Sequence, residues 1–164
     1  MKNIFGLDFG TTNSVLSVNN EGKVEIIDID EYNAVGKTLR SVLYFDEDGK
    51  SSVGQLAIEK YINEFASGRF MQSIKAFLPD KNFEYTYVNK KRFDLIDLVA
   101  IILRAIKKKG EEYIGEEVDS VIMGRPVVFS EYAEKDQLAE SRLRMAAEKV
   151  GFKARLGCST INSS

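Results

Sequence analysis

The segment Gly6-Leu7-Asp8-Phe9-Gly10-Thr11-Thr12-Asn13-Ser14 restricts the possible folds of this chain more than any other. An apolar stretch, residues 4–8, ends in the carboxylate of Asp8, and an alternating stretch, residues 14–18, follows after a few small residues. This spacing predicts two antiparallel strands joined by a tight turn at residues 10–13. Small residues let the backbone of such a turn approach a phosphate with several N–H groups. The carboxylate of Asp8 can then face a hydrated Mg²⁺ ion, which keeps most of its waters.

The same turn has other interpretations. Gly, Thr and Asn all suit an ordinary β-turn, so the residues alone also allow a hairpin that binds no ligand. A P-loop is excluded because no Gly-Lys-Ser/Thr follows the turn. The dinucleotide fingerprint is excluded as well, since a strand rather than a helix comes next.

The rest of the chain alternates strand and helix patterns, which predicts an α/β fold with an opening antiparallel β-meander. The expected strands cover residues 24–29, 41–46, 50–53, 83–92 (as a hairpin) and 119–123. The expected helices cover residues 55–65, 95–109 and 130–150. Asp94 and Ser130 are the expected caps of the last two helices, Gly110 and Gly151 their expected ends, and Pro126 the end of the last strand. The basic run 107–109 is expected at a helix C-terminus, followed by an acidic turn.

Composition excludes several classes of function. The chain has 164 residues, a net charge of −2, one cysteine and no histidine. Histidine-based catalysis and histidine metal sites are therefore impossible, no internal disulfide can form, and no global charge attracts nucleic acid. The longest apolar stretch, residues 98–103, is too short to span a bilayer, and Met1-Lys2-Asn3 leads straight into a strand without a signal peptide. We expect a cytoplasmic protein without nucleic-acid or membrane partners.

The pattern Asp-x-Gly-Thr-Thr-x-Ser at residues 8–14 resembles the first phosphate loop of the actin-like ATPase superfamily, and within it the 70-kDa heat-shock (DnaK-type) chaperone family. Four further segments resemble that family in the same order: residues 40–45, residues 53–57, Ser73-Ile74-Lys75-Ala76-Phe77-Leu78 and residues 121–129. The Gly124-Arg125-Pro126 form is similar to a divergent bacterial DnaK-like subgroup. The resemblance implies the first, ribonuclease H-like lobe of an actin-like ATPase.

The resemblance also implies roles for individual residues. Lys75 is the catalytic residue that it implies, and Gly10, Thr11, Thr12 and Asn13 are the phosphate-binding residues. Asp8 would hold Mg²⁺ through water. The implied cofactors are ATP and Mg²⁺, and the implied partners are unfolded protein clients or co-chaperones. Asn13 stands where these chaperones often carry an aromatic residue.

The resemblance covers residues 3 to about 153, and we expect residues 1–153 to form the first lobe of the nucleotide-binding domain. Residues 154–164 do not resemble the family and are expected to form a tail. The second glycine-rich phosphate loop, the adenosine-contacting segment and the peptide-binding domain of the family have no counterpart in the sequence. We therefore expect a truncated ATP-binding lobe of a DnaK-like chaperone ATPase that is inactive by itself. The alternatives are a fragment of a sugar kinase of the same fold and a non-catalytic interaction module.

Overall fold

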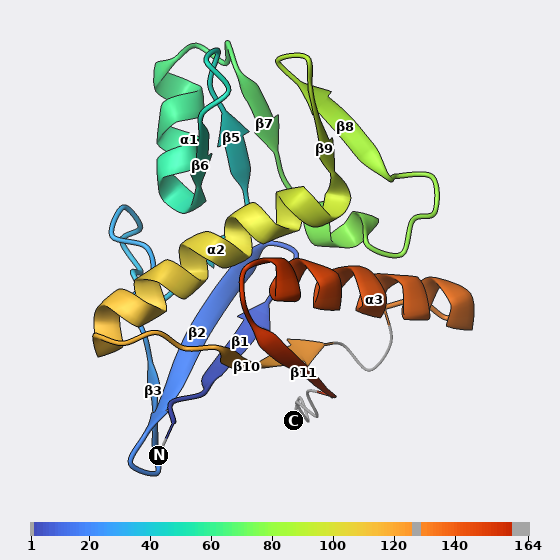
Figure 1. Ribbon diagram of the computed structural model, residues 1–164. Coiled ribbons are helices and arrows are strands. Elements are labelled where there is room, and N and C mark those ends of the chain that lie inside the picture. The colour runs from blue at the N-terminus through green and yellow to red at the C-terminus, as the bar shows by residue number, and fades with distance from the viewer. Residues whose placement is uncertain (1, 126–128, 159–164) are drawn as a thin grey trace.

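A computed structural model describes residues 2–125 and 129–158 of the chain. The strands of its main sheet are β1 (Phe5–Phe9), β2 (Asn13–Asn20), β3 (Lys23–Ile26), β4 (Leu39–Arg40), β10 (Ser120–Arg125) and β11 (Lys153–Cys158). Their order is β11-β10-β1-β2-β3, and the short β4 pairs with β2 (Figure 1). Strands β1, β2 and β3 are antiparallel neighbours, whereas β10 runs parallel to both β1 and β11. The predicted opening meander and the predicted parallel position of the strand at residues 119–123 are confirmed. Its expected burial is confirmed on one face only, because Val121 and Met123 are buried whereas Ile122, on the other face, is 48% exposed.

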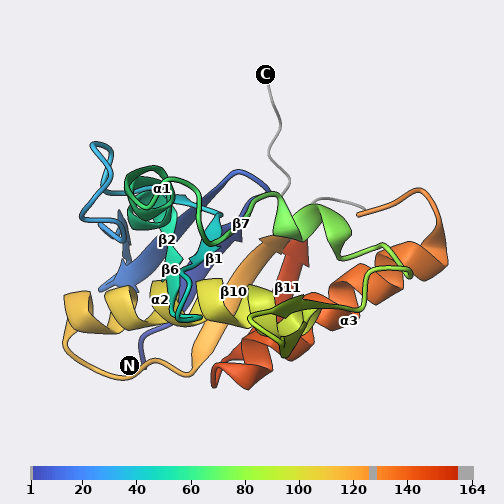
Figure 2. The same cartoon turned by 90° about the horizontal axis from the view of Figure 1, so that it is seen from above.

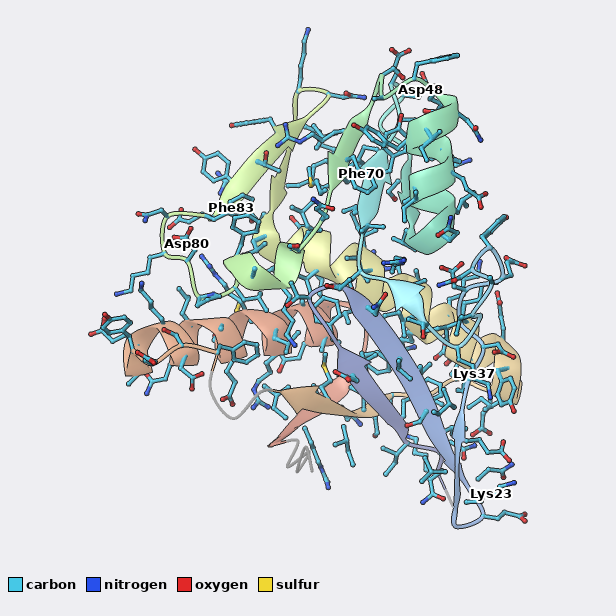
Figure 3. All side chains as sticks on the ribbon, turned by 180° about the vertical axis from the view of Figure 1, so that it is seen from behind. Lys23, Lys37, Asp48, Phe70, Asp80 and Phe83 are labelled. Carbon is cyan, nitrogen blue, oxygen red and sulfur yellow. The ribbon has the colours of Figure 1, made fainter. Side chains whose placement is uncertain are left out.

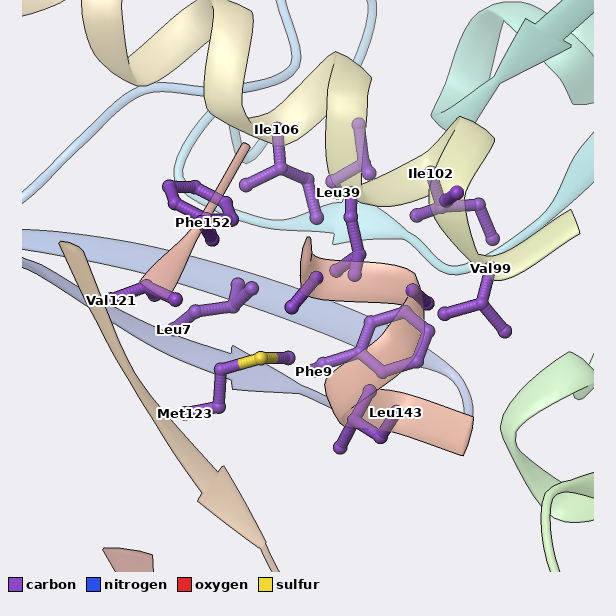
Figure 4. Close-up of a cluster of buried hydrophobic side chains, with 14 of the residues drawn as sticks. Leu7, Phe9, Leu39, Val99, Ile102, Ile106, Val121, Met123, Leu143 and Phe152 are labelled. Atoms are coloured by element: carbon purple, nitrogen blue, oxygen red, sulfur yellow. The ribbon is translucent and has the colours of Figure 1, made fainter. Parts of the chain in front are cut away.

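Two long helices, α2 (Leu95–Ile114) and α3 (Ala133–Lys149), lie on one face of this sheet (Figures 1 and 2). The side chains of Phe5, Leu7 and Phe9 alternate toward that face and are at most 2% exposed. Buried side chains of α2, including Val99 and Ile106, pack on them in a continuous core (Figure 4). This arrangement follows from the period of two residues in a strand and of 3.6 in a helix.

A smaller part, residues 43–94, occupies the top of Figure 1. It contains a three-stranded sheet, a helix, a 3₁₀ turn and a hairpin: β5 (Leu43–Phe45), β6 (Ser51–Val53), α1 (Gly54–Asn63), β7 (Arg69–Met71), η1 (Ile74–Phe77), β8 (Tyr85–Val88) and β9 (Lys91–Asp94). The two predicted hairpins, β5–β6 and β8–β9, are confirmed. Strand β7 was missed, because three residues are too few to show an alternating pattern. Figure 3 shows Phe70 and Phe83 among the side chains of this part.

The predicted end of α2 at Lys109 is wrong, since the helix continues through Gly110 to Ile114. Gly110 lies where the helix touches the sheet, and a Cβ there would be 2.6 Å from both Leu16 Cδ2 and Phe5 Cζ. The missing side chain allows this close contact. The helix ends at Gly115, whose φ of 75° is the left-handed conformation typical of a C-terminal glycine.

The expected position of the basic run at a helix end is also wrong, because residues 107–109 lie inside α2. Lys107 Nζ is 2.5 Å from Glu111 Oε1, one helical turn ahead. Lys109 Nζ is 3.6 Å from Glu112 and 3.2 Å from Glu31. The acidic residues therefore pair with the basic run along the helix surface.

Helix α3 begins at Ala133 rather than directly after Ser130, so the predicted Ser130 cap is wrong. The Ser130 hydroxyl instead accepts a hydrogen bond from the N–H of Tyr132, at 3.2 Å. Gly151, with φ of 88°, follows the helix as predicted. Pro126 lies outside the described residues. Strand β11 covers residues 153–158, and its Ala154 and Leu156 pack against the core, so the first residues of the expected tail belong to the main sheet.

We predict that Gly110→Ala lowers the free energy of unfolding by about 1–3 kcal/mol. Overpacking of the buried Phe5 and Leu16 side chains would outweigh the gain of about 1 kcal/mol that alanine brings to a helix interior. Urea denaturation of the wild type and the variant measures the difference. Gly115→Ala is the matched control, because a Cβ at Gly115 meets nothing within 4 Å and tests the left-handed conformation alone. A more stable Gly110→Ala protein would contradict the close helix–sheet contact.

Candidate functional site

The β1–β2 turn, residues 10–13, is the first feature of the candidate site. Thr11, Thr12 and Asn13 are exposed, and Gly10 is half-buried. The N–H of Gly10 donates to the carbonyl of Asn13 at 3.0 Å and closes the turn, so this N–H is not available to a ligand. Gly10 is required for another reason, because a Cβ there would lie 2.2 Å from the Asn13 carbonyl oxygen. The N–H groups of Thr11 and Thr12 have no hydrogen-bond partner among the described residues.

The segment that includes β4 forms hydrogen bonds with the turn and with the residue that follows it. The N–H of Ser41 donates to the Thr12 carbonyl at 2.8 Å. The hydroxyls of Ser14 and Ser41 are 2.9 Å apart and both residues are buried. These bonds fix the backbone of the turn while its other side stays in solvent. Neither serine was proposed as a site residue from the sequence, although both lie in the segments that carry the family resemblance.

Lys75, in η1, lies beside the start of this turn. Its ammonium donates to the Phe9 carbonyl at 2.5 Å. It also lies 5.9 Å from the centre of the Phe9 ring and 5.6 Å from that of Phe129. The residue before η1, Ser73, has a φ of 56°, so a left-handed backbone precedes the lysine. Phe129 is a site residue that sequence reasoning missed; it was counted only within the motif at residues 121–129.

The electrostatics of the site have one dominant feature, the partly buried ammonium of Lys75. Burial lowers the pKa of Lys75 below its ordinary value of 10.5, and the negative charge of Asp8 opposes that shift. Asp8 is exposed at the end of β1, on the sheet face opposite the core. The structure therefore brings Asp8, the turn and Lys75 together at one end of the sheet.

These residues fit phosphate oxygens and a hydrated divalent cation. The two exposed N–H groups and the ammonium can face an anion, and Asp8 offers one exposed carboxylate. Within residues 2–125 and 129–158, no group of three or more His, Cys, Asp or Glu side chains can hold a metal ion. A single carboxylate suits Mg²⁺, which takes few protein ligands beside water and substrate phosphates.

In the described part of the chain, no helix is long and apolar enough to cross a membrane.

Comparison with known proteins places these residues in a family. The family model described as Hsp70 protein matches residues 4–141. The chaperone protein DnaK of Endomicrobium trichonymphae is 33% identical over 133 residues, which are 80% of this chain and 21% of that relative. The chain belongs to the Hsp70 family. It spans about a fifth of the length of this relative, and all of the candidate site residues lie inside the matched range.

We predict that Asp8→Asn lowers the pKa of Lys75 further, because it removes the charge that opposes the effect of burial. The pKa of Lys75 should be lowest in Asp8→Asn, higher in the wild type, and in both proteins below the ordinary value of 10.5. Titration of the assigned Lys75 side chain by NMR, from neutral to alkaline pH, measures both proteins. Because the folded state binds this proton less tightly than the unfolded state, stability from this group should rise with pH between the two pKa values. A wild-type pKa at or above 10.5 would contradict the proposed burial of the ammonium.

Proposed function

We propose that residues 1–153 form the first lobe of a DnaK-like nucleotide-binding domain and that this lobe binds ATP with Mg²⁺ through the β1–β2 turn. The observation that carries the proposal is the position of the Lys75 ammonium at that turn, within 2.5 Å of the Phe9 carbonyl. Membership of the Hsp70 family supports it and favours this function over the sugar-kinase alternative. Residues 154–158, which we expected in the tail, continue strand β11 of the same sheet and therefore belong to this lobe as well.

Each residue then has a distinct part. The N–H groups of Thr11 and Thr12, with the Asn13 side chain, would bind phosphate oxygens, and Gly10 would keep the turn closed. Asp8 would hold Mg²⁺ through its waters. Lys75 would place a positive charge beside the terminal phosphate, where it stabilises the negative charge that develops during transfer to water. The bound Mg²⁺ would neutralise charge on the same phosphates.

In a longer protein of the family, such a lobe would couple ATP hydrolysis to the binding of unfolded protein clients and to contacts with co-chaperones. The lobe by itself supplies only one wall of a nucleotide site. Sites that bind small molecules well bury most of the ligand in a cleft. We therefore propose that the 164-residue chain alone binds ATP weakly and hydrolyses it at a negligible rate.

Titration of the chain with ATP and Mg²⁺ by calorimetry, beside a steady-state phosphate-release assay, tests the proposal. We expect weak binding that requires Mg²⁺, with affinity lowered roughly three- to tenfold by Lys75→Ala. Lys75 is only partly buried, and in a site with one wall water would still screen its contact with a phosphate, which limits that contact to about 1 kcal/mol. Lys23→Ala is the matched control, because Lys23 lies at the β2–β3 turn, at the other end of β2 (Figure 3).

Two results would contradict the proposal. Equal affinity of the wild type and of Lys75→Ala for ATP would show that Lys75 does not contribute to phosphate binding. Tight binding with turnover that Lys75→Ala abolishes would show that the short chain is a complete ATPase.

A further inference from the structure

Two neighbouring cavities lie along the outward side of α2. The first, of about 530 Å³, is lined by α2, by residues 29–32 and by parts of β6 and α1. The second, of about 340 Å³, is lined by α2, β9 and Lys149 of α3. Both are lined by Ile101 and Arg104, so they form one groove, which we call the α2 groove. Neither cavity is lined by the β1–β2 turn or by Lys75.

The α2 groove carries more positive charge than its acidic residues neutralise. Four of its cations, Lys50, Lys60, Lys91 and Arg104, form no ion pair with any described residue. Lys108 is 76% exposed and its Nζ is 3.9 Å from Glu112, at the limit of an ion pair. The whole chain has a net charge of −2, so this groove stands apart from the average surface.

The acidic side chains of the groove already contact backbone N–H groups or two of its lysines, Lys109 and Lys149. The carboxylate of Asp30 accepts hydrogen bonds from the N–H groups of Gln55, at 2.9 Å, and of Tyr32, at 3.2 Å. Asp97 accepts from the N–H of Asp94 and forms an ion pair with Lys149. Glu31 and Glu112 both contact Lys109 (Nζ–Oε distances 3.2 and 3.6 Å). The cations that remain can attract an external anion.

The floor of the larger cavity is apolar. Ile29 and Leu39 are at most 4% exposed, and Val53, Leu56 and Ile101 are partly buried around them. An apolar floor gives no advantage to an inorganic anion or to a nucleic-acid backbone. It suits a large apolar side chain that enters the cavity as an anchor while the charged rim selects the flanking residues.

We propose that the α2 groove binds an acidic peptide segment of a partner protein. One large apolar side chain of the segment occupies the 530 Å³ cavity, and carboxylates on either side of it face Lys50, Lys60 and Arg104. The segment approaches α2 from outside and leaves the β1–β2 turn free. Peptide binding is therefore independent of ATP.

Fluorescence anisotropy with a labelled peptide tests this proposal. The probe is a short peptide of Asp and Glu with one central Leu, titrated with the full chain at low salt. We expect saturable binding that weakens as salt rises, because the rim charges are exposed to solvent. Replacement of the central Leu by Gly should weaken binding, and a peptide with Lys in place of the acids should not bind.

Charge reversal locates the site. Arg104→Glu and Lys60→Glu should each weaken binding of the acidic peptide on the order of tenfold, since each adds a like charge to the rim. Lys23→Glu, which makes the same change at the exposed β2–β3 turn, is the matched control and should bind like the wild type. Thermal unfolding of each variant shows whether it is folded, and Arg104→Gln provides a milder change at the same position.

Three results would overturn the proposal. The first is equal binding of the Leu and Gly peptides, which would leave the apolar cavity without a role. The second is equal loss of affinity in the groove variants and in Lys23→Glu. The third is binding of a single-stranded oligonucleotide of the same charge as tightly as the peptide, which would identify a general surface for polyanions.

Discussion

The packing of α2 against the inner face of β1 and β2 is the contact on which the rest of the structure depends. At Gly110 the helix approaches so closely that even a methyl group would meet Phe5 and Leu16. The other end of the same helix begins at Asp94, where the side chains of Asp94 and Asp97 cap it next to strand β9. One rigid helix therefore joins the main sheet to the smaller part of the protein. Since η1 also contacts α2, this helix helps to fix the position from which Lys75 reaches the β1–β2 turn.

The sequence predicted those elements whose signals are local. The meander of β1 to β3, the two hairpins and the start of α2 each depend on alternation, turn residues or a capping box within a few positions. The error at Gly110 has a different cause. Glycine at the end of a periodic segment usually stops a helix, but Gly110 is kept inside α2 by contact with strands about a hundred residues earlier in the chain. Such a contact is invisible in a local pattern.

The candidate site was only partly predictable for the same reason. The exposed small residues of the turn follow from their own chemistry, whereas Lys75 is one of 23 basic residues and was selected by the family resemblance. The hydrogen bond that occupies the Gly10 N–H depends on the geometry of turn closure, which residue types do not specify. The α2 groove is the feature that a local sequence pattern could predict least. Lys50 and Arg104 are far apart in the sequence, and they line the same cavity only because α2 passes beside β6.

The charges at the β1–β2 turn also bear on which ligand the site suits. The ammonium of Lys75 faces a carbonyl oxygen and two aromatic rings, which stabilise a cation less well than a carboxylate or bulk water would. Burial lowers its pKa for that reason, and a bound anion would reverse the shift. A phosphate without a metal ion would meet the negative charge of Asp8, and Mg²⁺ without a phosphate would meet the positive charge of Lys75. Under the proposed function, each ion would remove the repulsion that the other encounters, so this combination of charges would favour a magnesium–phosphate pair over either ion alone.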